Sequence, residues 1–71
     1  MRLPEIELFA IGTELALGRV QDTNSFWIAQ QVAAMGGHLR RITVVIDSLD
    51  EIVEALDGAI RRSTEILITT G

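Results

Sequence analysis

The sequence contains no cysteine and no tyrosine, and it has one proline among 71 residues. Without cysteine, neither disulfide bonds nor a thiolate metal site can stabilise the fold. A domain of this size buries only about 60% of the surface of its unfolded chain. We therefore expect marginal stability from one small hydrophobic core.

Basic residues are also scarce, with six against ten acidic ones and a net charge of −4. This balance argues against nucleic acid or an anionic membrane as a general partner. A phosphate ligand is still compatible, because helix N-termini or a bridging metal can offset local charge. Glu5 and Glu7 interrupt any amino-terminal apolar segment, and no apolar run is long enough to span a bilayer. The prediction is a cytoplasmic protein.

Three segments have the patterns of β-strands. Residues 5–11 alternate in polarity, which predicts a strand with a water-exposed beginning and an end buried on both faces. Residues 38–46 predict a second strand, and its arginines favour an edge position. The unbroken apolar run at residues 66–68 is typical of a central parallel strand buried on both faces.

A helix is expected from Asp22 or Thr23, either of which can cap it, to about Met35. Its apolar face comprises Ile28, Val32 and Met35, and Trp27 is expected to pack at the flank of that face. Gly36 and Gly37 follow, and glycine readily adopts the left-handed conformation that ends a helix.

Ser48 and Glu51 form a capping-box pattern that predicts the start of a second helix. Apolar residues follow at helical spacing, and Arg61 and Arg62 end the helix where cations suit its dipole. This pair and the Arg40–Arg41 pair are interpreted as solvated charges. The element order is thus βαβαβ. Because the most buried-looking strand comes last, we expect residues 1–71 to be the amino-terminal portion of one domain that continues beyond Gly71.

Ligands of open parallel sheets bind beyond the carboxyl ends of the strands, where the strand order reverses. Residues 12–22, 47–48 and 69–71 are expected at this edge. Of the acids there, Asp22 is either a helix cap or a ligand-binding residue, and Asp47 is either a turn residue or a functional one. Glu14 has no evident structural role, which favours a functional one. No dinucleotide-binding or P-loop glycine pattern occurs, and His38 has no partner at metal-ligand spacing.

Ile11 to Leu15 read Ile-Gly-Thr-Glu-Leu, and Gly18 and the Asp22-Thr23-Asn24 motif follow. This combination resembles the opening of the competence/damage-inducible protein A (CinA) family. The opening domain of that family is similar to the MoaB/Mog molybdopterin-binding domain, and the related domain of eukaryotic FAD synthases shares the motif. The resemblance implies a three-layer α/β/α fold with the first strand between the second and third, in the order 2-1-3.

The resemblance also implies roles for residues at the ligand edge. Glu14 and Asp47 would be catalytic, and no metal ligand is assigned. The residues implied in binding the cofactor are Gly12, Thr13, Asp22, Thr23, Asn24, Thr69, Thr70 and Gly71. In the family, the motif that begins at Thr69 continues into further glycines, so we expect the 71-residue chain to be inactive by itself.

Two activities follow from the resemblance. The CinA branch implies hydrolysis of a nucleotide pyrophosphate such as ADP-ribose, with a divalent metal such as Mg²⁺ or Co²⁺. The Mog branch implies binding of a molybdopterin without hydrolysis. In both cases the partner is a small nucleotide or pterin phosphate. We also expect self-association through the uncovered edge of the strand at residues 65–69.

Overall fold

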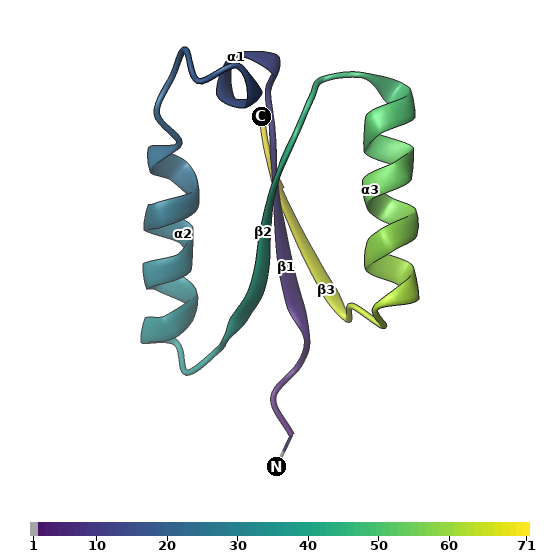
Figure 1. The fold of residues 1–71 in the computed structure, drawn as a ribbon. Coiled ribbons are helices and arrows are strands. Elements are labelled where there is room, and N and C mark those ends of the chain that lie inside the picture. The colour runs from purple at the N-terminus through teal and green to yellow at the C-terminus, as the bar shows by residue number, and fades with distance from the viewer. Residues whose placement is uncertain (1) are drawn as a thin grey trace.

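The computed structural model describes residues 2–71. A three-stranded parallel sheet in the order β2-β1-β3 separates α2 on one face from α3 on the other (Figure 1). The elements in chain order are β1 (Ile6–Ile11), α1 (Thr13–Ala16), α2 (Thr23–Ala34), β2 (Leu39–Val45), α3 (Leu49–Arg61) and β3 (Ile66–Thr70). The structure confirms the predicted α/β class, the three layers and the strand order.

Strand β1 lies at the centre of the sheet and is the most buried element. Leu8, Phe9 and Ala10 are at most 1% exposed, and Glu7 is fully buried. The prediction of a water-exposed beginning was therefore wrong for Glu7. Within residues 2–71 β3 pairs with β1 alone and leaves Ile66 exposed, and the expectation that β3 is a central strand of a larger sheet stays a prediction. Burial follows from having strands on both sides, and β1 has them.

The main core lies between the sheet and α3, where Phe9, Val45 and Ala59 pack together with Ile52 and Leu67 around them. On the opposite face, α2 contributes Val32 as its buried hydrophobic residue. Within residues 2–71, no helix has the length and apolarity needed to cross a membrane.

Two predictions about the apolar face of α2 were wrong. Trp27 is exposed, because it lies five residues before Val32 and hence about 140° away around the helix. Met35 is exposed as well, because it is the C-cap residue at the end of the helix.

The ends of the helices are set by different groups. Asp22 caps α2, its carboxylate accepting a hydrogen bond of 3.1 Å from the Ser25 backbone N–H. Gly36 follows α2 with φ 83°, the left-handed conformation expected there. Ser48 is the N-cap of α3, but its hydroxyl makes no capping hydrogen bond, so the predicted capping box does not form. The sequence pattern located the start of α3 correctly. Whether the Ser48 hydroxyl forms the capping bond depends on its rotamer, which the surrounding packing sets.

Candidate functional site

The carboxyl ends of all three strands lie at one end of the sheet, together with the N-termini of the helices (Figure 1). We call this end the carboxyl edge. The tips of β1 and β2 are joined there by a 2.9 Å hydrogen bond from the Gly12 N–H to the Val45 carbonyl. Gly12 is buried between them. The turn that follows β1 is therefore held against the sheet.

The tip of β3 lies directly beside that of β1. Ala10 pairs with Thr70 in the sheet register, so Gly71 comes next to Ile11. Gly71 has φ 140°, and a Cβ built on it would lie 2.3 Å from the Ile11 carbonyl oxygen. Glycine is required by this close backbone approach. The structure thus brings the two predicted glycine tips together.

Thr13 connects the turn after β1 to the turn after β2. Its hydroxyl oxygen accepts a 3.3 Å hydrogen bond from the Asp47 N–H, which holds Asp47 at the same edge. The Glu14 carboxylate folds back over Gly12, since a Cβ built on Gly12 would lie 2.8 Å from Glu14 Oε1. Both acids are exposed. Glu14 and Asp47 therefore flank Thr13 with their carboxylates open to a ligand.

The Asp22-Thr23-Asn24 motif begins α2 at the same end of the molecule. Asp22 acts as the helix cap, the structural role that the sequence had left open beside ligand binding. Thr23 and Asn24 are exposed on the first turn, and within residues 2–71 no hydrogen bond joins their side chains to the Gly12 turn. On β3, Thr69 is exposed and Thr70 is half-buried.

Ser25 is a candidate that the sequence analysis passed over. It is 4% exposed, and its hydroxyl oxygen has no hydrogen-bond partner within the part of the chain described. A buried hydroxyl without a partner is unusual, because the missing hydrogen bond costs about 1–3 kcal/mol. The one signal in the sequence was its position directly after the Asp22-Thr23-Asn24 motif.

Within residues 2–71, the carboxyl edge offers backbone N–H groups rather than a cluster of metal ligands. Across residues 2–71, no three Asp, Glu or His side chains gather into a cluster that could hold a divalent metal. No side chain caps the N-termini of α1 and α3, which leaves their first-turn N–H groups for other acceptors. Such N–H groups suit the oxygens of a phosphate-bearing group.

Residues 7–71 match a protein family described as "probable molybdopterin binding domain". The chain belongs to this family. It is 45% identical over 65 residues to a CinA-like protein of Kosmotoga olearia, covering 92% of this chain and 16% of that protein. It is 44% identical over 66 residues to a CinA-like protein of Prochlorococcus marinus, covering 93% of this chain and 15% of that protein.

A protein of Sulfurisphaera tokodaii is 45% identical over 65 residues, which cover 92% of this chain and 25% of the relative. The chain thus spans about a quarter or less of the length of these relatives. No solved structure matches the chain significantly. These findings confirm the resemblance to the MoaB/Mog-like amino-terminal domain of the CinA family.

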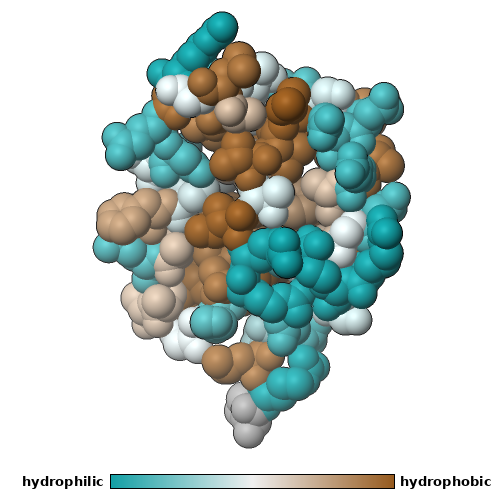
Figure 2. Space-filling view, in the orientation of Figure 1, coloured by the Kyte–Doolittle hydropathy of each residue, from teal (hydrophilic) through white to brown (hydrophobic). Residues whose placement is uncertain are grey.

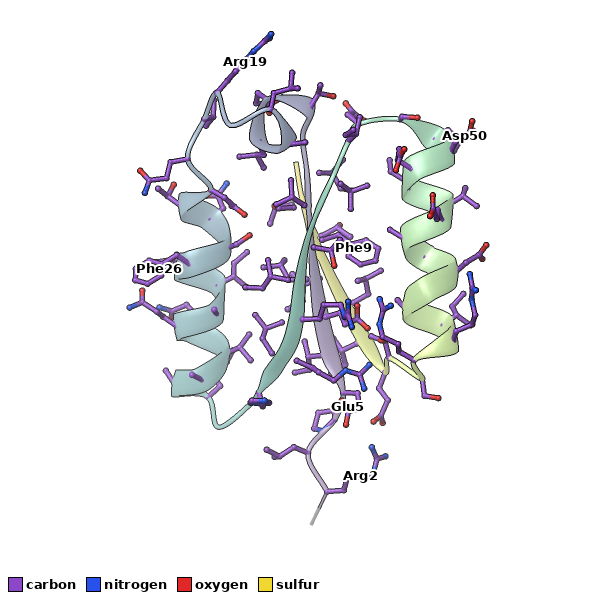
Figure 3. The ribbon with its side chains drawn as sticks, in the orientation of Figure 1. Arg2, Glu5, Phe9, Arg19, Phe26 and Asp50 are labelled. Atoms are coloured by element: carbon purple, nitrogen blue, oxygen red, sulfur yellow. The ribbon has the colours of Figure 1, made fainter. Side chains whose placement is uncertain are left out.

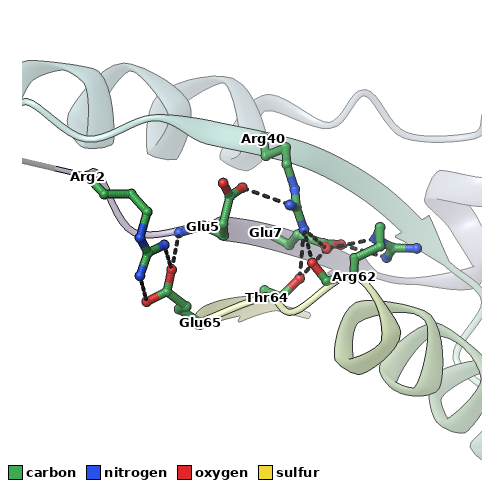
Figure 4. A network of polar contacts seen from close by, with 7 residues as sticks. All are labelled: Arg2, Glu5, Glu7, Arg40, Arg62, Thr64 and Glu65. Carbon is green, nitrogen blue, oxygen red and sulfur yellow. Dashed lines mark hydrogen bonds and ion pairs between the residues drawn. The ribbon is translucent and has the colours of Figure 1, made fainter.

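This molybdopterin-binding-type domain has a second polar cluster at the opposite end of the sheet, around the buried Glu7 (Figure 4). Arg62 donates to both carboxylate oxygens, at 2.7 and 2.9 Å, and Arg40 donates at 3.3 Å. The Thr64 hydroxyl donates as well. The hydrogen bonds from Arg62, followed by those from Thr64 and Arg40, lower the pKa of Glu7 to about 2.

The interpretation of Arg40 and Arg62 as solvated charges was therefore wrong. Both side chains are about a third exposed and neutralise a carboxylate within the sheet. Glu7 alternates with apolar residues in β1. The sequence pattern predicted that this end of the strand is exposed to water. Because this cluster is far from the carboxyl edge, we interpret it as structural.

Proposed function

We propose that the chain binds the phosphate or pyrophosphate end of a pterin or nucleotide at its carboxyl edge. The observation that carries the proposal is the contact between the Gly71 backbone and the end of β1, which places the carboxyl ends of β1 and β3 side by side. The family match and the uncapped N-terminus of α3 support it.

In this arrangement, the N–H groups of Thr13 and Glu14 and the backbone at Gly71 donate to the phosphate oxygens, while the Gly12 N–H stays bonded to the Val45 carbonyl. The carboxylates of Glu14 and Asp47 repel a phosphate, so they accept hydrogen bonds from the hydroxyl or ring N–H groups of the same ligand. The ligand is therefore expected to carry both an anionic group and hydrogen-bond donors.

Backbone amide NMR spectra of the chain test this proposal by titration with ADP-ribose and with inorganic pyrophosphate. The amide signals of Gly12 and Gly71 are expected to shift with ligand concentration. Gly36 and Gly58 serve as internal references, because Gly36 lies at the far end of α2 and Gly58 lies within α3. Uniform shifts of all four glycines, or none at saturating ligand, would contradict a site at the carboxyl edge.

Two matched variants distinguish a specific role of Glu14 from the general effect of removing one negative charge. Glu14→Gln removes a carboxylate beside Gly12, whereas Glu54→Gln removes one from the exposed surface of α3. If Glu14 accepts a donor of the ligand, Glu14→Gln lowers the affinity for ADP-ribose about tenfold, the effect of one hydrogen bond to a charged group. Glu54→Gln leaves it unchanged.

A second candidate function is hydrolysis of the bound pyrophosphate, favoured by the exposed Glu14 carboxylate next to Gly12 and by the CinA-like relatives. Glu14 would orient a water molecule toward phosphorus, the bridging P–O bond would break, and ADP-ribose would yield AMP and ribose 5-phosphate.

The test incubates this chain and the longer Kosmotoga olearia protein with ADP-ribose and either Mg²⁺ or Co²⁺. AMP formation by the longer protein supports hydrolysis in the family, and the same assay tests whether the 71-residue chain is inactive by itself. Retained binding without turnover by either protein favours the binding function alone.

A further inference from the structure

Two hydrogen bonds hold the turn between β2 and α3, which consists of Ile46, Asp47 and Ser48. Within the turn, the Ser48 N–H donates to the Ile46 carbonyl at 2.7 Å and closes a three-residue turn with Asp47 at its centre. The other bond joins a different segment of the chain, since the Asp47 N–H donates to the Thr13 hydroxyl oxygen at 3.3 Å. The position of Asp47 therefore depends on Thr13 as well as on its own turn.

Thr13 is itself held in place by the backbone around it. The Gly12 N–H, one residue before, donates to the Val45 carbonyl at 2.9 Å and fastens this turn to the end of β2. The Thr13 carbonyl accepts a 3.0 Å hydrogen bond from the Leu17 N–H, which closes the turn of α1. Thr13 is half-buried, and its branched side chain has few rotamers. Its hydroxyl is therefore a well-placed anchor for the turn that follows β2.

Both turns lie at the carboxyl edge, where Figure 3 shows α1 and the start of α3, marked by Asp50, at the same end of the sheet. Hydrophobic side chains gather at this end in Figure 2, and Leu17 and Ile46 are among the exposed apolar residues of the two turns. Apolar contacts are non-directional, whereas a hydrogen bond weakens steeply away from its preferred distance and angle. Of the contacts that a ligand makes here, those of Asp47 therefore depend most on how firmly its turn is held.

We propose that Thr13 is a positioning residue, whose hydroxyl fixes the backbone at Asp47 so that the Asp47 carboxylate accepts a hydrogen bond from the ligand. This inference rests on the proposed function, in which that carboxylate binds a hydroxyl or ring N–H group. It gives Thr13 an indirect role in place of the contact with the cofactor that the family resemblance implied. Thr13 thereby favours a ligand that carries such donors over a bare pyrophosphate.

Hydrogen exchange of the Asp47 backbone amide, measured by NMR without ligand, tests the hydrogen bond itself. Thr13→Val removes the hydroxyl but keeps the branched shape, and it should speed up this exchange several-fold. Thr13→Ser keeps the hydroxyl and should leave the exchange slow. Thr43→Val is the matched control, because it removes a hydroxyl from the middle of β2, four residues before Asp47. Equal exchange in Thr13→Val and the unmodified chain overturns the proposal.

Calorimetric titration with ADP-ribose and with inorganic pyrophosphate tests the role of Thr13 in recognition. Thr13→Val should lower the affinity for ADP-ribose about fivefold, the effect of one hydrogen bond. The affinity for pyrophosphate should stay unchanged, because pyrophosphate has no ribose hydroxyl or ring N–H for Asp47 to bind. Thr13→Ser and Thr43→Val should bind both probes like the unmodified chain. A general loss of structure, or a direct contact of Thr13 with phosphate, would lower both affinities together, and that result overturns the proposal.

A double-mutant cycle with Asp47→Ala distinguishes positioning from a direct contact with the rest of the ligand. Asp47→Ala removes the carboxylate but keeps the backbone N–H, so adding Thr13→Val should cause little further loss of affinity for ADP-ribose. Losses that add in full would mean that Thr13 contacts the ligand itself, and they overturn the proposal. A chain that binds neither probe overturns the proposed function and the recognition role of Thr13 with it, whereas the exchange of the Asp47 amide tests the hydrogen bond independently of any ligand.

Discussion

Glu7 shows how much one buried side chain depends on partners from distant parts of the chain. Its carboxylate is fully buried in the central strand, and its partners come from β2, the end of α3 and the turn before β3. Burying a charge is costly unless it is paired and hydrogen-bonded. The cluster therefore ties three segments of the chain to β1.

Glu7→Gln should destabilise the fold by about 3 kcal/mol, because it leaves Arg62 beside an uncharged group within the sheet. Glu51→Gln is the matched control, since Glu51 is exposed on α3 and forms no ion pair within residues 2–71. Urea unfolding measures both free energies. Equal losses in the two variants would show that the Glu7 cluster contributes no more than a surface charge.

The lowered pKa of Glu7 also predicts a pH dependence. Above its ordinary value of 4.5 the carboxylate is ionised in the folded and the unfolded protein, and its stabilisation is complete. As the pH falls toward its folded value of about 2, the unfolded chain takes up the proton first and the stabilisation is lost. Urea midpoints should thus fall more steeply between pH 5 and pH 2 in the unmodified chain than in Glu7→Gln. Parallel curves would contradict the lowered pKa.

At the scale of single elements, α2 and α3 begin with similar polar residues but use them differently. Asp22 bonds to the first turn of α2, whereas the hydroxyl of Ser48 makes no bond to α3. Helix α3 instead has Asp50 and Glu51 in its first turn, where acids interact favourably with the dipole.

This difference predicts unequal costs for two alanine substitutions. Asp22→Ala should lower the unfolding free energy by about 1 kcal/mol, the usual effect of removing a helix cap. Ser48→Ala should cost clearly less, because no capping hydrogen bond is lost. Thermal unfolding followed by circular dichroism compares the two. A larger loss for Ser48→Ala would mean that the capping box forms in solution after all.

For the molecule as a whole, burial is concentrated on one strand. In residues 2–71 the buried hydrophobic side chains are Ile6, Leu8, Phe9, Ala10, Val32, Val45 and Ala59, and most of them belong to β1. Helix α2 has Ser25 and Val32 as its buried residues. Few buried apolar contacts mean a low free energy of local opening.

Hydrogen exchange should therefore be slowest for the amides of Leu8 to Ala10 and much faster throughout α2. The slowest amides report global unfolding, for which a small core predicts only a few kcal/mol. Exchange measured by NMR at several temperatures resolves the two groups. Equal protection of α2 and β1 would show that the helix is held more firmly than its buried contacts indicate.

The features that sequence alone determined are those set by residues close to one another in the chain. The Asp22 cap bonds three residues ahead, the left-handed Gly36 ends the helix before it, and the βαβαβ order follows from local periodicity. Such patterns act over a few residues, so they can be recognised without knowing the fold. The strand pattern likewise located the turn after β1 at the carboxyl edge of the sheet.

Within residues 2–71, the tertiary structure decided which strand is central, the burial of Glu7, the absence of a hydrogen-bond partner for the Ser25 hydroxyl and the contact of Gly71 with Ile11. Each depends on a neighbour from a distant part of the chain: β1 is buried because β2 and β3 pair on its two sides. Alternating polarity marks a strand but carries no information about its place in the sheet, and an acid in that pattern looks exposed until its arginine partners are brought to it.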